Sequence, residues 1–390
     1  MPLSNIKISK IPAPLNPVFG SFNKYANVFG VNVVATSKVS DTTIIHGASI
    51  IAQYLDNDED GVCDDQILCN LLYANHGSLI IFEDYDDRQS FFNLEERSFE
   101  DWKNVMNLGM TIGYENIQYL LAEEMIPNSV SLDAFKHDGS GGYFNEQFDD
   151  TLRESLHLIF HSGVKNIHKE FGERHGSDLA DGIDEINGDC GSGEEGTYKD
   201  PSLNQCTGFY AVEDKGCDYD CRINLGIYWS LTSILGAQNY TSNIHNINEQ
   251  WMLGEPADFK EKAPKLNYLL NNHAYYTWLP SKLPNGRYLG TLPDVKINGV
   301  PDYATIVIVA MSITLLWVIA GCVFACWKGE SCCFSRCPRS RNSTRGGSHI
   351  EGVEMGLVGK KKKKRRSYIE ESWEWVKVKT RKEGGGGCWD

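Results

Sequence analysis

A run of 24 uncharged residues, from Ala304 to Trp327, constrains this chain more than any other feature. A helix of that length rises ~36 Å, which is enough to cross a hydrocarbon core of ~30 Å. Tyr303 and Trp327 stand at its two ends, where aromatic rings favour the membrane–water interface. The alternative is a buried core helix, but a soluble core rarely needs so long an uncharged run. The sequence therefore predicts one transmembrane helix over residues 303–327, with the lipid bilayer as its partner.

Charge predicts which side of the membrane each part occupies. The tail after Trp327 has 16 Lys and Arg against 8 Asp and Glu, whereas residues 1–302 have 21 against 44. Basic residues close to a span stay on the cytoplasmic side. We therefore expect a cytoplasmic tail over residues 328–390 and an extracellular or lumenal N-terminal part. The basic run Lys360–Arg366 is typical of segments that bind anionic lipid headgroups.

The start of the chain does not fit this topology by itself. Its first 30 residues contain no continuous apolar segment of the kind found in signal peptides. An ectodomain of this size normally needs such a signal to cross the membrane. We interpret this as a missing signal rather than an unusual topology, because the charge asymmetry and the cysteines agree on an outside location.

Six cysteines precede the span, an even number that favours three disulfides in an oxidising compartment. We expect local pairing: Cys63 with Cys69, Cys190 with Cys206, and Cys217 with Cys221. Six reduced, buried thiols are the alternative. On the same side, Asn239 begins an Asn-Tyr-Thr triplet and is a candidate N-glycosylation site.

Apolar periodicity predicts a mainly helical α+β domain over residues 27–290. The expected strands are 28–35 and 78–83, and the expected helices are 42–55, 66–74, 114–125, 150–171 and 223–237. Residues 172–222 are rich in Gly and Asp and are expected to form loops. We expect an irregular, proline-containing arm over 1–26, a stalk over 291–302 and a disordered Gly/Ser-rich tail.

An acidic loop lies between the helices predicted at 42–55 and 66–74. Asp56, Asp58 and Asp60 alternate before Gly61, and Asp64 and Asp65 follow. This spacing resembles the opening of EF-hand and thrombospondin-type calcium loops, in which alternate carboxylates converge on a hard cation. The position of the closing EF-hand glutamate is occupied by Ile67. The resemblance implies calcium binding by the five aspartates, and an acidic helix–helix turn without calcium is the alternative.

A polar stripe follows the helix predicted at 150–171. Glu154, His157 and His161 share one helical face, and His168 continues it. Two histidines four residues apart can bind one zinc ion, so this segment resembles a zincin helix. Leu158 stands where a zincin has its general-base glutamate, which leaves Glu154 as the candidate catalytic residue or ligand.

The third zinc ligand is left open between His168 and the pair Asp218 and Asp220. Those two aspartates can equally cap the helix that follows them. A Glu-x-x-His di-iron site lacks a second copy of its motif. In the simplest alternative the histidines are hydrogen-bonded to local acids and bind no metal. His175, Asp178, Asp181, Asp184 and Glu185 lie in a loop that can approach the same site.

The sequence contains no nucleophile elbow, P-loop or dinucleotide fingerprint, and the net charge of −23 over residues 1–302 disfavours nucleic-acid binding. Two functions remain. One is a membrane-anchored, metallopeptidase-like ectodomain, active or inactive, that binds calcium and zinc and acts on an unknown substrate. The other is a calcium-stabilised adhesion or receptor ectodomain with an unknown extracellular ligand.

Overall fold

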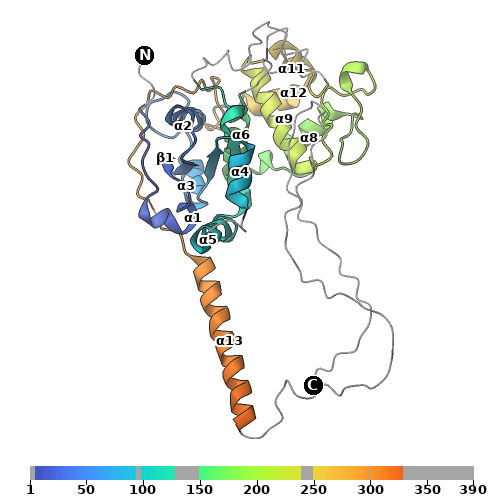
Figure 1. Cartoon of the computed structure of the whole chain (residues 1–390). Coiled ribbons are helices and arrows are strands. Elements are labelled where there is room, and N and C mark those ends of the chain that lie inside the picture. The colour runs from blue at the N-terminus through green and yellow to red at the C-terminus, as the bar shows by residue number, and fades with distance from the viewer. Residues whose placement is uncertain (1–4, 94–97, 128–148, 239–248, 298, 328–390) are drawn as a thin grey trace, which may run out of the picture.

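The computed structural model describes residues 5–93, 98–127, 149–238, 249–297 and 299–327. The chain forms a mixed α/β fold whose four-stranded sheet is covered by helices on both faces, and one long helix projects from it (Figure 1). The candidate glycosylation site Asn239, the basic run Lys360–Arg366 and the whole tail lie outside the described residues.

The sheet begins with a hairpin of β1 (Lys24–Val28) and β2 (Val31–Ala35). The sequence predicted a single strand over 28–35, which is wrong because Phe29 and Gly30 form a tight turn. Both have positive φ, 48° and 96°, the backbone geometry that two-residue hairpin loops need. A glycine inside an otherwise β-branched run was the available signal for this turn.

Two helical crossovers then build the parallel part of the sheet, whose order is β1-β2-β3-β4. The first contains α2 (Asp41–Leu55) and α3 (Gln66–Ala74) and leads to β3 (Ser78–Phe82), which confirms three predicted elements. The second contains α4 (Tyr85–Phe92), α5 (Phe99–Asn107), η3 (Leu108–Ile112) and η4 (Tyr114–Asn116).

The last strand, β4 (Ile117–Leu121), lies where the sequence predicted a helix, and it pairs with β3 in parallel. Ile117, Leu120 and Leu121 have helix-like spacing, but pairing with a buried neighbour overrides that local preference. The short turn η5 (Ala122–Glu124) follows.

The strands alternate between two apolar layers. Val31, Val33 and Leu79 face the cluster formed with α2, α3 and α6, whereas Val34 and Ile80 face the cluster formed with α1, α4 and α5. This alternation follows from the two-residue period of a strand. Along the chain, helices separate β2 from β3 and β3 from β4, whereas β1 and β2 are consecutive and the described elements after β4 are helical.

The predicted irregular arm packs against the sheet. It contains η1 (Ala13–Leu15) and α1 (Asn16–Phe19), and its apolar side chains Leu15, Val18, Phe19 and Phe22 are buried. Pro14 and Pro17 sit within the first two residues of these short helices, a position at which proline is well tolerated.

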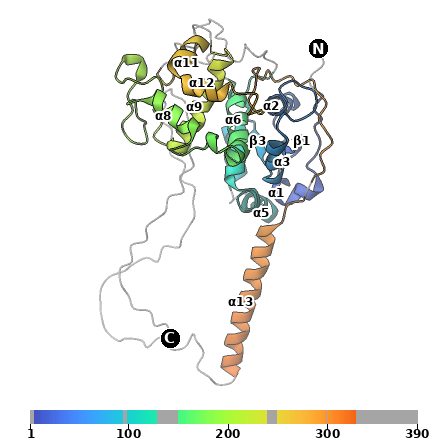
Figure 2. The ribbon, with the colours of Figure 1, turned by 180° about the vertical axis from the view of Figure 1, so that it is seen from behind.

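A second, helical lobe follows β4 and shares the larger core. The stretch predicted as one helix over 150–171 is divided into α6 (Asp150–Ile159), the π-helical η7 (Phe160–Val164), α7 (Lys165–Ile167) and η8 (Lys169–Phe171). The other helices that the structure describes in this lobe are α8 (Asp178–Asn187), η9 (Pro201–Leu203), α9 (Tyr219–Ile234), α11 (Pro256–Lys262) and α12 (Pro264–Leu270). Figure 2 shows α8, α9, α11 and α12 grouped on the side away from β1.

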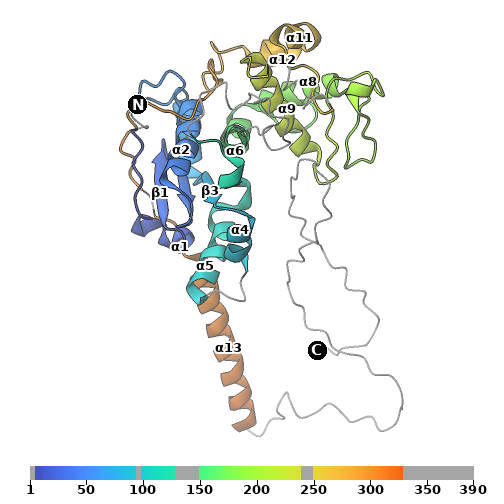
Figure 3. The same cartoon turned by 45° about the horizontal axis from the view of Figure 1, so that its top comes forward.

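Residues 271–302 return from the second lobe to the sheet lobe. The segment predicted as a stalk packs against the domain: the Tyr73 hydroxyl donates to the Lys296 carbonyl at 2.6 Å, and Asn107 Nδ2 donates to Asp302 Oδ1 at 2.9 Å. The final helix, α13 (Tyr303–Trp327), then leaves the domain beside α5 (Figure 3).

Helix α13 is long and apolar enough to cross a membrane, and it is the one such helix among the residues that the structure describes. Only 6% of the segment Tyr303–Ala320 is buried, which separates it from the core helix of a soluble protein. All three predicted disulfides are present, linking Cys63 to Cys69, Cys190 to Cys206, and Cys217 to Cys221. They fit an extracellular or lumenal domain.

Candidate functional site

The acidic loop between α2 and α3 brings three carboxylates together. Single oxygens of Asp56, Asp58 and Asp64 all lie within 4.8 Å of one another. Within the described part of the chain, no other group of three His, Cys, Asp or Glu residues converges in this way. Gly61, at φ 90°, turns the loop, and the Cys63–Cys69 disulfide ties it to α3. The three aspartates can therefore hold a hard cation such as calcium.

The electrostatics of this loop favour a bound cation. Burial raises the pKa of Asp56 and of Asp64, and the nearby charges of Asp58 and Asp60 contribute to the increase at Asp64. Asp56 is fully buried and accepts a backbone hydrogen bond from Gly61 at 2.8 Å. Repulsion between these charges is unfavourable unless a cation or protons compensate it.

The other two predicted calcium ligands have local structural contacts. Asp60 Oδ1 accepts from the Val62 amide at 2.7 Å. Asp65 is the N-cap of α3, and its Oδ1 accepts from the amides of Ile67 and Leu68, both at 3.0 Å. An aspartate directly before a helix is the usual signal for such a cap, and that signal was present in the sequence.

A distant segment closes over the acidic loop. Asn57 Oδ1 accepts from the Ser281 amide at 2.8 Å, and Glu59 Oε2 accepts from the Leu289 amide at 2.7 Å. The Tyr288 hydroxyl donates to Asp56 Oδ2. We call residues 281–291 the covering segment. Its role was not readable from the sequence, because more than 220 residues separate the partners of each contact.

The histidine helix places two of its predicted zinc ligands side by side. The rings of His157 and His161 meet edge to face with centroids 5.8 Å apart. His161 Nδ1 lies 2.9 Å from Oε1 of Glu173, a residue that sequence analysis did not single out. Glu173 precedes α8 in a Gly-rich loop, so no periodic pattern connects it to the histidines.

Lys165 occupies the position between these groups. Its ammonium lies 3.0 and 3.1 Å from the two ring nitrogens of His161 and also contacts Glu173 Oε2. Glu173 is 5% exposed, and Asn224 Nδ2 donates to its Oε1 at 2.6 Å. Burial would raise the pKa of Glu173, but the hydrogen bonds from His161 and Lys165 lower it to about 2. Lys165 thus supplies the positive charge that a metal would otherwise provide here.

The candidate catalytic residue Glu154 is held as a charged partner. Its Oε1 lies 3.0 Å from Arg153 Nη2, and its Oε2 lies 3.9 Å from His157 Nδ1. Burial would raise the pKa of Glu154, but Arg153 and His157 lower it overall. A general base that works near neutral pH usually has a raised carboxyl pKa, so this environment suits an ion pair better than proton transfer.

The three remaining zinc candidates do not join the two histidines in one site. His168 Nε2 lies 3.5 Å from Asp65 Oδ2, and its ring packs against Tyr276. Asp218 is the N-cap of α9 and accepts from the Cys221 amide at 3.0 Å. Burial raises the pKa of Asp220, and the nearby charge of Glu173 raises it further. The described residues therefore fit calcium at the acidic loop better than they fit zinc at the histidine helix.

Compared with protein-family models, curated proteins and solved structures, the chain matches none of them.

Proposed function

We propose that this chain is a single-pass membrane protein whose ectodomain is a calcium-stabilised binding module rather than a hydrolase. One observation carries the proposal. The carboxylates of Asp56, Asp58 and Asp64 converge, whereas Lys165 already compensates the charge of Glu173 and contacts His161. The module would serve adhesion or reception of an extracellular ligand.

Calcium at the acidic loop would act on more than the loop itself. The covering segment contacts Asp56, Asn57 and Glu59 and leads directly into residues 292–302 and α13. A cation that orders the loop would therefore stabilise the connection between the second lobe and the membrane helix. The loop's three aspartates offer only oxygen ligands, the type that calcium prefers.

A zinc-dependent hydrolase remains the second candidate because His161 Nδ1 lies 2.9 Å from Glu173 Oε1, a spacing that two ligands of one metal can have. It requires Lys165 to leave its place between them. The absence of a general base after His157, where Leu158 stands, argues against this candidate.

Thermal unfolding of the full-length protein in phosphatidylcholine nanodiscs tests the two candidates. After chelation, calcium at about a hundredfold its dissociation constant should add about 2.7 kcal/mol, or roughly 5–10 °C in Tm. Zinc should leave the Tm unchanged. Metal analysis that finds one zinc per chain, together with peptidase activity that is lost in His157→Ala, would contradict the proposal and support the hydrolase.

The proposed topology is tested separately on intact cells. We expect added protease to digest residues before the span and to leave a protected fragment with the basic tail, which would then be free to bind anionic lipid through Lys360–Arg366. Protection of the N-terminal part, with digestion of the tail, would indicate the opposite topology.

A further inference from the structure

Exposed apolar side chains lie beside the start of α13. Phe99, the first residue of α5, and Met110 of η3 are both exposed, and both elements contact α13. Trp102 is partly exposed and stacks on Phe99, with ring centroids 5.9 Å apart. Tyr303 is exposed at the first residue of α13 itself. We call Phe99, Trp102, Met110 and Tyr303 the α5 surface.

Hydrogen bonds hold α13 in a fixed position against this surface. Asn107 is the fully buried last residue of α5, and its Oδ1 accepts from the Ala304 amide at 2.9 Å. Its Nδ2 donates to Asp302 Oδ1, also at 2.9 Å, and the Thr111 hydroxyl of η3 donates to the Pro301 carbonyl at 3.2 Å. The direction in which α13 crosses a bilayer therefore decides which face of the domain meets that bilayer.

The length of α13 sets the depth at which the α5 surface lies. Its 25 residues rise ~37 Å, about 7 Å more than a hydrocarbon core of ~30 Å, so its ends extend into the headgroup regions. Lys103 connects the α5 surface to that level. Its Nζ lies 3.4 Å from Thr305 Oγ1 in the first turn of α13 and 5.7 Å from the Phe99 ring centroid. Aromatic rings at this depth are favoured.

The charged side chains of α5 are compensated within the protein. Lys103 Nζ lies 2.8 Å from Glu100 Oε2. Asp101 accepts from the hydroxyls of Ser21 and Ser98 at 2.6 and 2.7 Å. A charge that already has a partner costs less to move out of bulk water than an isolated one. The aromatic rings can therefore enter a headgroup layer without bringing an unpaired carboxylate with them.

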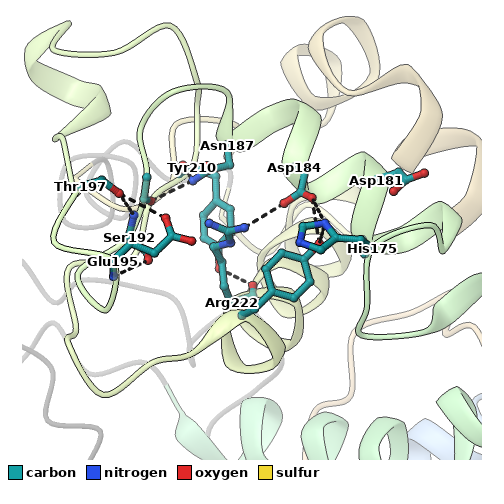
Figure 4. Close-up of polar contacts among 12 residues, drawn as sticks. His175, Asp181, Asp184, Asn187, Ser192, Glu195, Thr197, Tyr210 and Arg222 are labelled. Atoms are coloured by element: carbon teal, nitrogen blue, oxygen red, sulfur yellow. Dashed lines mark hydrogen bonds and ion pairs between the residues drawn. The ribbon is translucent and has the colours of Figure 1, made fainter.

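The second lobe has a different kind of surface. An open pocket there is lined by residues of α8, the loop after it and α9, several of them charged. Figure 4 shows Arg222 between Glu195 and Asp184, and Arg222 Nη2 lies 2.9 Å from Asp184 Oδ1. This lobe lies away from α13 (Figures 1 and 3). Exposed aromatic rings thus lie beside α13, whereas the open, charged pocket lies far from it.

We propose that the α5 surface rests on the headgroup layer of the bilayer that α13 crosses. Its partner is the lipid surface, because the α5 surface continues the apolar surface of α13 and is held against it. This inference rests on the proposed membrane span and adds the face of the ectodomain that meets the membrane. The second lobe then points away from the bilayer, where an extracellular ligand can reach it (Figure 1).

Tryptophan emission in brominated nanodiscs tests the contact. Full-length Phe99→Trp is placed in phosphatidylcholine nanodiscs with or without bromine on the acyl carbons next to the headgroups, since bromine quenches only indoles close to it. The emission that Phe99→Trp adds to that of the native protein should fall about twofold or more in the brominated discs. Tyr268→Trp is the matched control, because Tyr268 is exposed on α12 in the second lobe, and its added emission should not change.

Phe99 is 60% exposed and Tyr268 is 77% exposed, so both variants should fold, and equal melting midpoints will confirm this. Added emission from Phe99→Trp that bromine leaves unchanged would overturn the proposal, and so would equal quenching at both positions. Trp317→Phe tests the span separately: it should reduce the quenching seen with bromine near the chain ends, because Trp317 lies within α13. If Trp317 is quenched and position 99 is not, the span stands and the surface contact fails. Quenching at neither position would contradict both.

Discussion

The acidic loop and the histidine helix were both predicted to bind metal, but the charges in the two regions are arranged differently. The acidic loop gathers Asp56, Asp58 and Asp64 within 4.8 Å, and its local charges repel one another. In the histidine helix, the positive charge of Lys165 is already next to His161 and Glu173. One region therefore has an unmet need for a cation, whereas the other has a cation of its own.

The local backbone explains much of this difference. The three converging aspartates lie within nine residues on one loop, so local geometry nearly suffices to bring them together. Glu173 follows His161 by only 12 residues, but it lies in an irregular loop outside the helical pattern, and it contacts Lys165. Chemistry inferred from one compact loop is therefore safer than chemistry that depends on a residue outside the local pattern.

The largest expected effect is loss of the calcium response. Asp64→Asn should abolish the Tm increase of roughly 5–10 °C because it removes one of three converging carboxylates. Asp65→Asn is the matched neighbour: asparagine still caps α3, so the calcium shift should remain. Calcium titrations followed by calorimetry will measure both. Equal losses of the calcium shift in the two variants would mean that the loop binds calcium as a diffuse acidic patch.

Replacement of Lys165 should leave the histidine helix with an uncompensated negative charge, as in the acidic loop. Lys165→Met leaves the buried Glu173 without one charged partner and should cost about 2 kcal/mol, measured by denaturant unfolding. Zinc should then raise the Tm of this variant but not that of the native protein. Lys169→Met in the neighbouring turn is the control. A variant that is destabilised yet indifferent to zinc would show that the geometry, not the lysine, prevents metal binding.

The two regions should also respond to pH with opposite signs. The pKa of Glu173 is lowered from 4.5 to about 2, so its stabilising contribution is complete above pH 4.5 and is lost as the pH falls toward 2. Over the first pH unit below 4.5 the loss amounts to about 1 kcal/mol, and its slope approaches about 1.4 kcal/mol per pH unit between the two pKa values. The pKa of Asp64 is raised, so without calcium acidification should relieve the repulsion and stabilise the loop.

Unfolding with chelator, followed from neutral pH downward, separates these contributions when native protein is compared with Glu173→Gln and Asp64→Asn. Glu173→Gln should flatten the acid-side decline, and Asp64→Asn should remove the gain on mild acidification. If the gain in stability on mild acidification persists in Asp64→Asn, other carboxyl groups are its source.

The smallest expected effect concerns a predicted ligand that caps a helix. Asp218→Ala should cost about 1 kcal/mol, because Asp218 accepts from the Cys221 amide at the start of α9. Asp218→Asn should restore most of that stability. Neither change should alter the calcium or the zinc response. If the calcium or zinc response depends on Asp218, Asp218 is a metal ligand.

Elements with a strong local signal were predictable from the sequence. Helices α2 and α3, strand β3, all three disulfide pairs and α13 follow from apolar spacing, short Cys–Cys separations and an uncharged run. Strand β4 was missed because its spacing is helix-like and its partner β3 decides its conformation. The buried arm and the packed segment before α13 were missed because proline-containing and irregular chains give no periodic pattern.

By itself, the sequence determined the long apolar helix, the sign of the net charge before and after it in the chain, and the acidic loop, since each is set by neighbours along the chain. Only the tertiary structure decided that residues 281–291 cover the loop, that Lys165 neutralises Glu173, and that Arg222 of α9 lies beside the loop after α8 in an open pocket. The physical reason is that long-range contacts depend on how separate elements pack, and no local pattern encodes which side chains then meet.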